Sequence, residues 1–142
     1  ENATPSGAAK LAAKNQSTAR RVLVVDDNVD SASSMEMLLR IIGHEVRMAH
    51  DGLAAVEGAR EFLPEVMLLD IGLPGLNGYE VARRIKASDW GKAIVLIALT
   101  GWGQEEDRQR SREAGFARHM VKPIEHDELI KILDELDSSA SS

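Results

Sequence analysis

Five side chains that could carry out phosphoryl chemistry each follow a run of residues that favours a strand. They are Asp26 and Asp27, Asp70, Thr100 and Lys122. Each one alone is an ordinary residue for a turn, a helix cap or a strand end. If they meet, three carboxylates repel one another unless a cation lies among them, and an oxygen-only ligand set favours Mg²⁺. A metal ion and an ammonium group can neutralise phosphoryl oxygens while a carboxylate oxygen attacks phosphorus and forms an acyl phosphate.

The order of the predicted elements brings these side chains together. Short aliphatic runs predict strands over residues 22–25, 45–49, 66–69, 93–99 and 118–121. Helical spacing of apolar residues predicts helices over residues 29–42, 52–62, 77–86, 104–113 and 127–136, the third with a capping box at Asn77 and Glu80. Strict alternation predicts a parallel sheet with helices on both faces. Ligands of such sheets bind beyond the carboxyl ends of the strands, where all five side chains would lie.

The overall composition restricts the classes of function. With 142 residues, of which 44% are hydrophobic, the chain suits one folded domain. The absence of cysteine excludes disulfides, thiolate zinc sites and thiol nucleophiles. A net charge of -6 without a basic stripe argues against direct binding of nucleic acid. The longest apolar run, residues 93–99, is too short to span a bilayer, so no membrane contact by this domain is expected.

The domain boundaries follow from the periodicity of the apolar residues. Residues 1–20 are expected to form a linker or a segment added for expression, residues 21–136 the folded domain, and residues 137–142 a flexible tail. The histidines lack the spacing of a zinc site and are expected at the surface or in a switch. They are His44, His50, His119 and His126.

Four segments together resemble the signature segments of response regulator receiver domains of two-component signalling. They read VLVVDDN, LLDIGLPGLNGYEVARRIK, ALTGWG and MVKPI, and the resemblance covers residues 21–136. It implies an α/β fold of the flavodoxin-like (βα)5 type, a three-layer sandwich around a parallel five-stranded sheet of order 2-1-3-4-5. It also implies that the domain catalyses its own phosphorylation and dephosphorylation without being a conventional turnover enzyme.

The resemblance assigns roles to the residues at the strand ends. Asp70 is implied to be the phosphoacceptor, and Lys122 to pair with the phosphoryl group. The implied Mg²⁺ ligands are Asp70, Asp27 directly, Asp26 mainly through water, and the backbone carbonyl of Gly72. The Thr100 hydroxyl would bond to a phosphoryl oxygen and shift inward on activation.

Several neighbouring positions modify this pattern. His119 occupies the switch position that is often Tyr or Phe in the family, so a histidine, which can also rotate and can add pH dependence, replaces the usual aromatic residue. Gly72 and Trp102 lie where the family tunes hydrolysis of the acyl phosphate. Gly75 and Gly78 suit the loop and helix start after the acceptor. The peptide bond before Pro123 is implied to be cis.

The function implied is that of a phosphorelay receiver, which takes a phosphoryl group from phosphohistidine on a histidine kinase or a histidine phosphotransfer domain. Because the chain ends just after the last predicted helix, it is expected to be the C-terminal receiver of a hybrid sensor histidine kinase in the cytoplasm. A stand-alone response regulator, an Mg²⁺-dependent aspartyl-phosphate phosphatase and a flavodoxin-type cofactor binder are the alternatives. The oligomeric state is left open.

Overall fold

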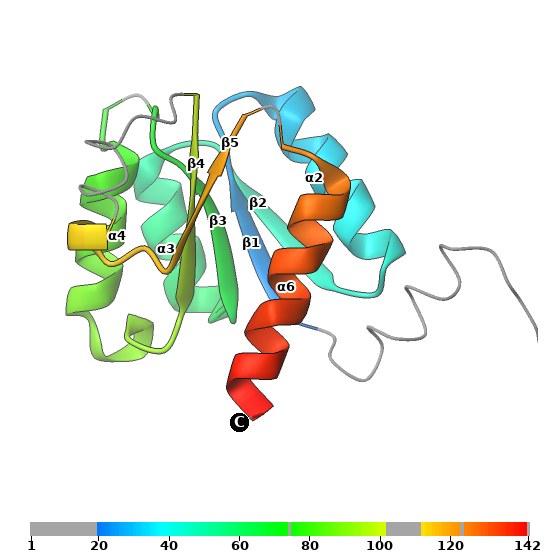
Figure 1. Cartoon of the computed structure of the whole chain (residues 1–142). Coiled ribbons are helices and arrows are strands. Elements are labelled where there is room, and N and C mark those ends of the chain that lie inside the picture. Colours follow the sequence, from blue (N-terminus) through cyan, green and yellow to red (C-terminus); the bar gives the residue numbers. More distant parts are fainter. Residues whose placement is uncertain (1–19, 74, 102–111, 123, 142) are drawn as a thin grey trace, which may run out of the picture.

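The computed structural model describes residues 20–73, 75–101, 112–122 and 124–141, with a single parallel sheet at its centre (Figure 1). The five strands have the order β2-β1-β3-β4-β5, which confirms the predicted topology. Their bounds are Arg21–Val25 for β1, Glu45–Ala49 for β2, Val66–Asp70 for β3, Val95–Thr100 for β4 and Arg118–Val121 for β5. Since all neighbouring pairs are parallel, every strand ends at the same edge of the sheet.

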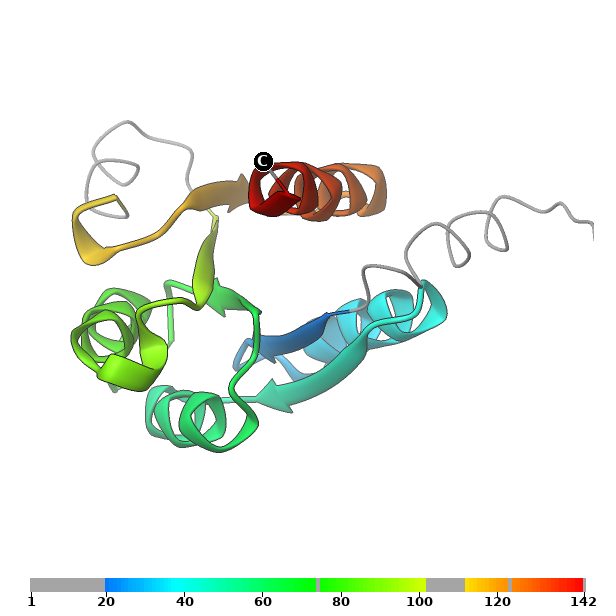
Figure 2. The ribbon, with the colours of Figure 1, turned by 90° about the horizontal axis from the view of Figure 1, so that it is seen from below.

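Helices cover both faces of the sheet (Figures 1 and 2). The bounds are Val29–Ile41 for α2, Gly52–Phe62 for α3, Gly78–Ala87 for α4 and His126–Ser141 for α6, with a short 3-10 helix η1 at Asp89–Gly91. Successive residues of β3 belong to different hydrophobic clusters. Met67 and Leu69 pack with residues of α3 and α4, whereas Val66 and Leu68 pack with residues of α2 and α6. The alternation of side chains along a strand thus explains the three layers.

Side-chain oxygens fix where three helices begin. Asn28 accepts a hydrogen bond from the Ser31 amide at the start of α2, and Asp51 accepts one from the Ala54 amide at the start of α3. Asn77 does the same for α4 by accepting from the amide of Glu80. The predicted cap at Asn77 is therefore confirmed. The Glu80 carboxylate pairs instead with Arg83, 2.7 Å away.

Two predicted elements, the fourth strand and the last helix, differ most from the structure in their bounds. The fourth strand was expected over residues 93–99 but begins at Val95 and includes Thr100. The reason is η1, since the Ile94 amide donates to the carbonyl of Gly91 and so belongs to a turn. The last helix was expected to end at Leu136 but continues to Ser141, because no glycine or proline interrupts it.

Two glycines hold the loop between β3 and α4 close to its surroundings. A Cβ atom at Gly52 would lie 2.2 Å from the carbonyl oxygen of Leu76, and one at Gly78 would lie 2.6 Å from the Cα of Ile71. Both distances are shorter than any side chain tolerates, and the opposing atoms are backbone. Gly52 at the start of α3 therefore lets the end of the loop after β3 approach closely, and Gly78 at the start of α4 does the same for the beginning of this loop.

His44 is a buried residue, so of the two roles predicted for the histidines, surface or switch, the surface position is wrong for His44. It is 5% exposed, and its Nδ1 accepts a hydrogen bond from the backbone amide of Arg20 at 3.0 Å. Burial lowers the pKa of His44, and the charge of Arg20 lowers it further, while Glu65 and Asp134 oppose the shift. Folding therefore favours the neutral imidazole.

We expect His44 to make the domain less stable in mild acid. Because the pKa of His44 is lowered in the folded state, its contribution to stability is fully present above its ordinary value of 6.5 and is lost as the pH falls below that value. Urea unfolding at pH 7 and pH 5 measures this. His44→Asn keeps an acceptor for Arg20 but cannot titrate, so its loss of stability over the same interval should be smaller. Equal losses for the two proteins would contradict the prediction.

Candidate functional site

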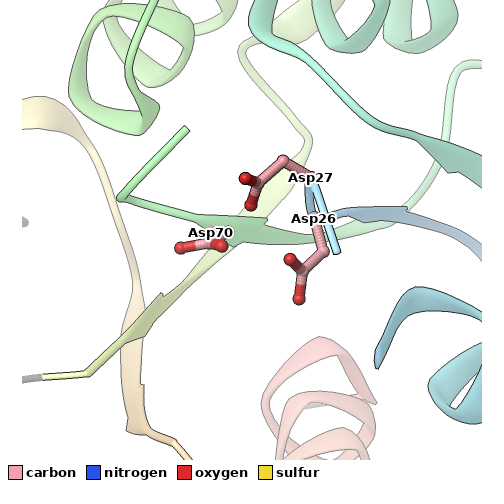
Figure 3. Close-up of side chains that lie close together, drawn as sticks. All are labelled: Asp26, Asp27 and Asp70. Atoms are coloured by element: carbon pink, nitrogen blue, oxygen red, sulfur yellow. The ribbon is translucent and has the colours of Figure 1, made fainter. Parts of the chain in front are cut away.

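Three carboxylates converge at the carboxyl edge of the sheet (Figure 3). Asp26 and Asp27 directly follow β1, and Asp70 is the last residue of β3. Each offers an oxygen to a cluster whose atoms all lie within 4.8 Å of one another. Asp26 is 3% and Asp70 6% exposed, whereas Asp27 is open to solvent. The parallel arrangement of β1 and β3 accounts for this convergence, because both strands end at the same level.

Asp26 is held in place by its main chain and its side chain. Its amide donates to the carbonyl of Ala49 at 3.1 Å, and its Oδ1 accepts from the amide of Asn28 at 2.9 Å. Burial raises the pKa of Asp26. The Asn28 hydrogen bond and the charge of Lys122 oppose the shift, and Asp70 adds to it. The negative charge on Asp26 therefore costs stability when no cation is bound.

Lys122 supplies positive charge to the cluster. Its Nζ lies 2.9 Å from Oδ2 of Asp70 and 3.4 Å from Oδ2 of Asp26. Partial burial by itself would lower the pKa of Lys122, but the hydrogen bond and charge of Asp70, followed by those of Asp26, raise it overall. The ammonium group therefore stays charged and faces the two buried carboxylates. Lys122 follows β5, and its amide donates to the Thr100 carbonyl at 2.7 Å.

The loop after Asp70 begins with a contact to the carboxylate itself. The Gly72 amide donates to Oδ1 of Asp70 at 2.9 Å. A Cβ atom at Gly72 would lie 3.6 Å from the same oxygen, which is an ordinary contact distance. The amide of Gly72 thus orients Asp70, and a side chain at this position would fit beside the carboxylate. Gly75 has a φ of +70°, so the loop uses a glycine where the backbone turns left-handed.

The two proposed switch residues lie on neighbouring strands but at different levels. Thr100 ends β4, is 5% exposed and pairs with Val121, one residue before Lys122. His119 pairs with Ala98, two residues earlier along β4 than Thr100, and is half-buried. Thr100 therefore lies at the edge that carries the carboxylates, and His119 lies below it in the sheet. Trp102, Pro123 and most of the predicted helix over residues 104–113 fall outside the described residues.

Sequence reasoning missed one residue next to the cluster. His50 lies in the loop between β2 and α3, and its Nδ1 is 3.0 Å from the carbonyl oxygen of Asp26. The two residues are separated by 24 positions, and nothing in the local pattern around His50 indicates the contact. Only the pairing of β1 with β2, which brings Ala49 beside Val25, makes it possible.

A groove lies beside the cluster, between α2 and α6. It encloses about 490 Å³ and reaches Asp26 and Lys122 at one end. Apolar side chains of both helices line it, including Met35, Leu38 and Leu129.

Within the described part of the chain, no helix combines the length and apolar character needed to cross a membrane.

Comparison with known proteins identifies the family. Residues 22–134 match the response regulator receiver domain. The protein PilH of Pseudomonas aeruginosa is 32% identical over 114 residues, which are 80% of this chain and 94% of PilH. The virulence sensor protein BvgS of Bordetella bronchiseptica is 34% identical over 142 residues, 96% of this chain and 12% of BvgS. The transcriptional regulatory protein PrrA of Mycobacterium tuberculosis is 38% identical over 113 residues, 80% of this chain and 48% of PrrA.

Solved structures agree with this assignment. The receiver domain of sensor histidine kinase PA1611 from Pseudomonas aeruginosa has a TM-score of 0.76 and 33% identity, covering 82% of this chain and 96% of that domain. Its structure holds a magnesium ion in the active site cleft. Chemotaxis protein CheY4 of Vibrio cholerae has a TM-score of 0.79 and 26% identity, covering 82% of this chain and 98% of CheY4.

The chain belongs to the response regulator receiver domain family and is a receiver domain of two-component signalling. Its relatives place such a domain in different settings. The chain spans nearly the whole of PilH, about half of PrrA and about an eighth of BvgS.

Proposed function

We propose that this receiver domain accepts a phosphoryl group on Asp70 from a phosphohistidine of its partner, with Mg²⁺ as the cofactor. The observation that best supports this is the cluster itself. Three carboxylates gather within 4.8 Å, and the Lys122 ammonium lies 2.9 Å from Asp70. A nucleophilic carboxylate, acidic metal ligands and a cation are the groups that transfer of a phosphoryl group to aspartate requires.

The residues present fit a magnesium ion. The donors are all oxygens, and Mg²⁺ prefers oxygen ligands while keeping part of its water shell. Asp26, Asp27 and Asp70 would hold it, and the Gly72 carbonyl would be a further ligand. When bound, the ion supplies positive charge to the phosphoryl oxygens. The acidic charge of the cluster, which raises the pKa of Asp26, would also be offset by a divalent cation.

The chain's own groups account for the transfer. An Asp70 carboxylate oxygen attacks phosphorus, the P–N bond to the donor imidazole breaks, and its electron pair remains on the imidazole nitrogen. Before the transfer, the Lys122 ammonium contacts the Asp70 carboxylate. After the transfer, it can pair with an oxygen of the phosphoryl group. The Gly72 amide keeps the other oxygen of Asp70 oriented, since it donates to Oδ1. The Thr100 hydroxyl lies at the same edge of the sheet, where it would bond to the phosphoryl group and move on activation, with His119 as the switch residue of β5.

The surface around the cluster suits a helical protein partner. α2 exposes Val29, Met37 and Ile41, which are 55%, 64% and 56% exposed, next to the groove that reaches Asp26 and Lys122. Val29, in the first turn of α2, is the exposed apolar residue nearest the carboxyl edge, and Met37 and Ile41 continue the apolar surface along the helix away from that edge. Such a surface would let a helix that carries phosphohistidine dock along α2 with its histidine beside Asp70. We assign the partner as a histidine kinase or a histidine phosphotransfer domain.

We further propose that the domain operates as the receiver of a hybrid sensor histidine kinase. The similarity to BvgS extends over 96% of this chain and supports this setting. A stand-alone regulator is the competing setting, supported by PilH, of which the chain covers 94%.

Incubation with acetyl phosphate and Mg²⁺ tests the proposed reaction. We expect intact-mass measurement to show one added phosphoryl group on the wild type, and none when EDTA removes the metal. Asp70→Asn should take up none, because an amide lacks the nucleophilic oxygen anion. Asp89→Asn, at an exposed position remote from the cluster, should react like the wild type. Absence of the phosphoryl group on the wild type, or its retention in Asp70→Asn, would refute the assignment.

A further inference from the structure

His50 makes a directed contact with the main chain of the acidic cluster. Its Nδ1 lies 3.0 Å from the carbonyl oxygen of Asp26. A carbonyl oxygen can only accept a hydrogen bond, so Nδ1 must carry the hydrogen and donate it. The amide of Asp26 is also bound, to the carbonyl of Ala49. The end of β2 therefore holds Asp26 on both sides of its Cα atom.

The carbonyl that His50 binds belongs to the peptide group between two cluster carboxylates. Because a peptide group is planar, fixing the direction of the Asp26 carbonyl also fixes the amide of Asp27 and the direction in which its Cα leaves β1. Asp27 is exposed. The orientation of its carboxylate toward Asp26 and Asp70 therefore depends on this peptide plane more than on packing of its side chain.

We propose that His50 is a positioning residue for the Mg²⁺ site, which it serves by holding the peptide plane that joins Asp26 to Asp27. The inference rests on the proposed binding of Mg²⁺ by this cluster. His50 would provide no ligand to the metal itself, but it would set the spacing of Asp26 and Asp27, which would. Partners of this kind around metal ligands are typically worth about 10-fold to 100-fold in metal affinity.

Other contacts already fix the loop that carries His50. Asp51 caps α3 by accepting from the Ala54 amide at 2.8 Å, and Gly52 packs against the backbone of Leu76. The hydrogen bond from the Asp26 amide to the Ala49 carbonyl secures the loop to the end of β1. Loss of the His50 side chain therefore leaves the fold in place and removes mainly the restraint on the carbonyl of Asp26.

Two substitutions of similar shape separate donation of a hydrogen bond from filling of space. In His50→Asn the amide nitrogen stands at the same number of bonds from Cα as Nδ1, so it can donate to the same carbonyl. His50→Leu has nearly the outline of asparagine but no donor. Titration of ¹⁵N-labelled, metal-free protein with MgCl₂, followed by amide chemical shifts, should show Mg²⁺ affinity about 10-fold lower for the leucine variant and within about twofold of wild type for the asparagine variant.

Asp51→Ala serves as the matched control, because it loosens the same loop by removing the cap of α3 while leaving His50 in place. Urea unfolding confirms that each variant is folded. Three results would overturn the role of His50 without affecting the proposed metal site. They are equal Mg²⁺ affinities for wild type and His50→Leu, an affinity of His50→Asn as low as that of His50→Leu, and a loss of Mg²⁺ affinity in Asp51→Ala equal to that in His50→Leu. A wild type whose amide shifts do not respond to MgCl₂ would overturn the proposed metal site as well.

Discussion

Asp26→Asn is expected to stabilise the metal-free domain and at the same time to weaken Mg²⁺ binding. Asp26 is 3% exposed, and burial and the neighbouring Asp70 raise its pKa, so its charge is unfavourable in the folded state. An asparagine retains an oxygen for the Asn28 amide and brings an N–H group toward the carboxylate of Asp70. It also gives up the attraction between Oδ2 and the Lys122 ammonium 3.4 Å away, which offsets part of the gain. We expect the free energy of unfolding in EDTA to rise by about 1–2 kcal/mol.

Magnesium should remove most of this difference in stability. A ligand that binds only the folded state at one hundred times its dissociation constant adds about 2.7 kcal/mol. The wild type should gain this stabilisation. The variant, lacking one carboxylate of the cluster, should bind Mg²⁺ about tenfold more weakly and gain about 1.4 kcal/mol, which brings the two proteins to within about 1 kcal/mol of each other. Urea unfolding with EDTA and with saturating MgCl₂ measures both effects.

The exposed Asp89 provides the comparison for Asp26. Its carboxylate is fully exposed and pairs with Lys92 across 3.4 Å. Asp89→Asn removes the same formal charge, yet we expect little change in stability or in the response to MgCl₂. If Asp26→Asn destabilises the metal-free protein, the charge of the buried Asp26 carboxylate does not cost the fold stability, which would contradict this prediction.

Lys122→Met is expected to slow phosphorylation strongly. Among the residues that neither bind the metal nor attack phosphorus, we expect Lys122 to have the largest effect on the rate. Lys122 is the cation nearest to Asp70 within the described residues, at 2.9 Å. Without it, the developing charge on the phosphoryl group loses a positioned cation, a loss typically worth about 100-fold in rate. The rate of phosphoryl uptake from acetyl phosphate at saturating Mg²⁺ measures this.

The same substitution should destabilise the metal-free domain, in contrast to Asp26→Asn. Asp26 and Asp70 would then face each other without the ammonium, at a cost of roughly 1–2 kcal/mol, below that of a wholly buried pair because Lys122 is about one-third exposed. Lys92→Met, at an exposed position, is the control and should change neither property. A Lys122→Met protein that reacts at the wild-type rate would exclude a role for this ammonium in the transfer.

Much of the fold and of the cluster could be predicted because both follow from a repeating pattern. Strands that alternate with helices must run parallel, and parallel strands end at one edge. Asp26, Asp27 and Asp70 each stand at the end of a strand, so their convergence needed no knowledge of packing. Lys122 follows the same logic, and the structure places its Nζ against two of the three carboxylates.

Other features depend on contacts between distant parts of the chain. His50 meets Asp26 only because β2 lies beside β1, and no local pattern encodes that meeting. Leu63 ends α3 with a φ of 49°, where glycine or asparagine is the expected residue. Its carbonyl accepts two hydrogen bonds from the guanidinium of Arg21, at 3.1 and 2.7 Å, which holds the backbone in this conformation. Tertiary contacts of this kind override local preference.

The position of Lys122 also gives the sheet a mechanical tether. β5 is one of the two edge strands of the sheet and lies beside β4. Yet the ammonium that follows it reaches Asp70 at the end of β3 and the carboxylate of Asp26 beyond β1. One flexible side chain thus ties the rim of the sheet to its centre across an intervening strand. A new anionic group that pairs with Lys122 would replace its contacts with Asp70 and Asp26 without breaking a backbone hydrogen bond. A chemical change at the end of β3 would in this way alter the restraint on β5 at the edge of the sheet.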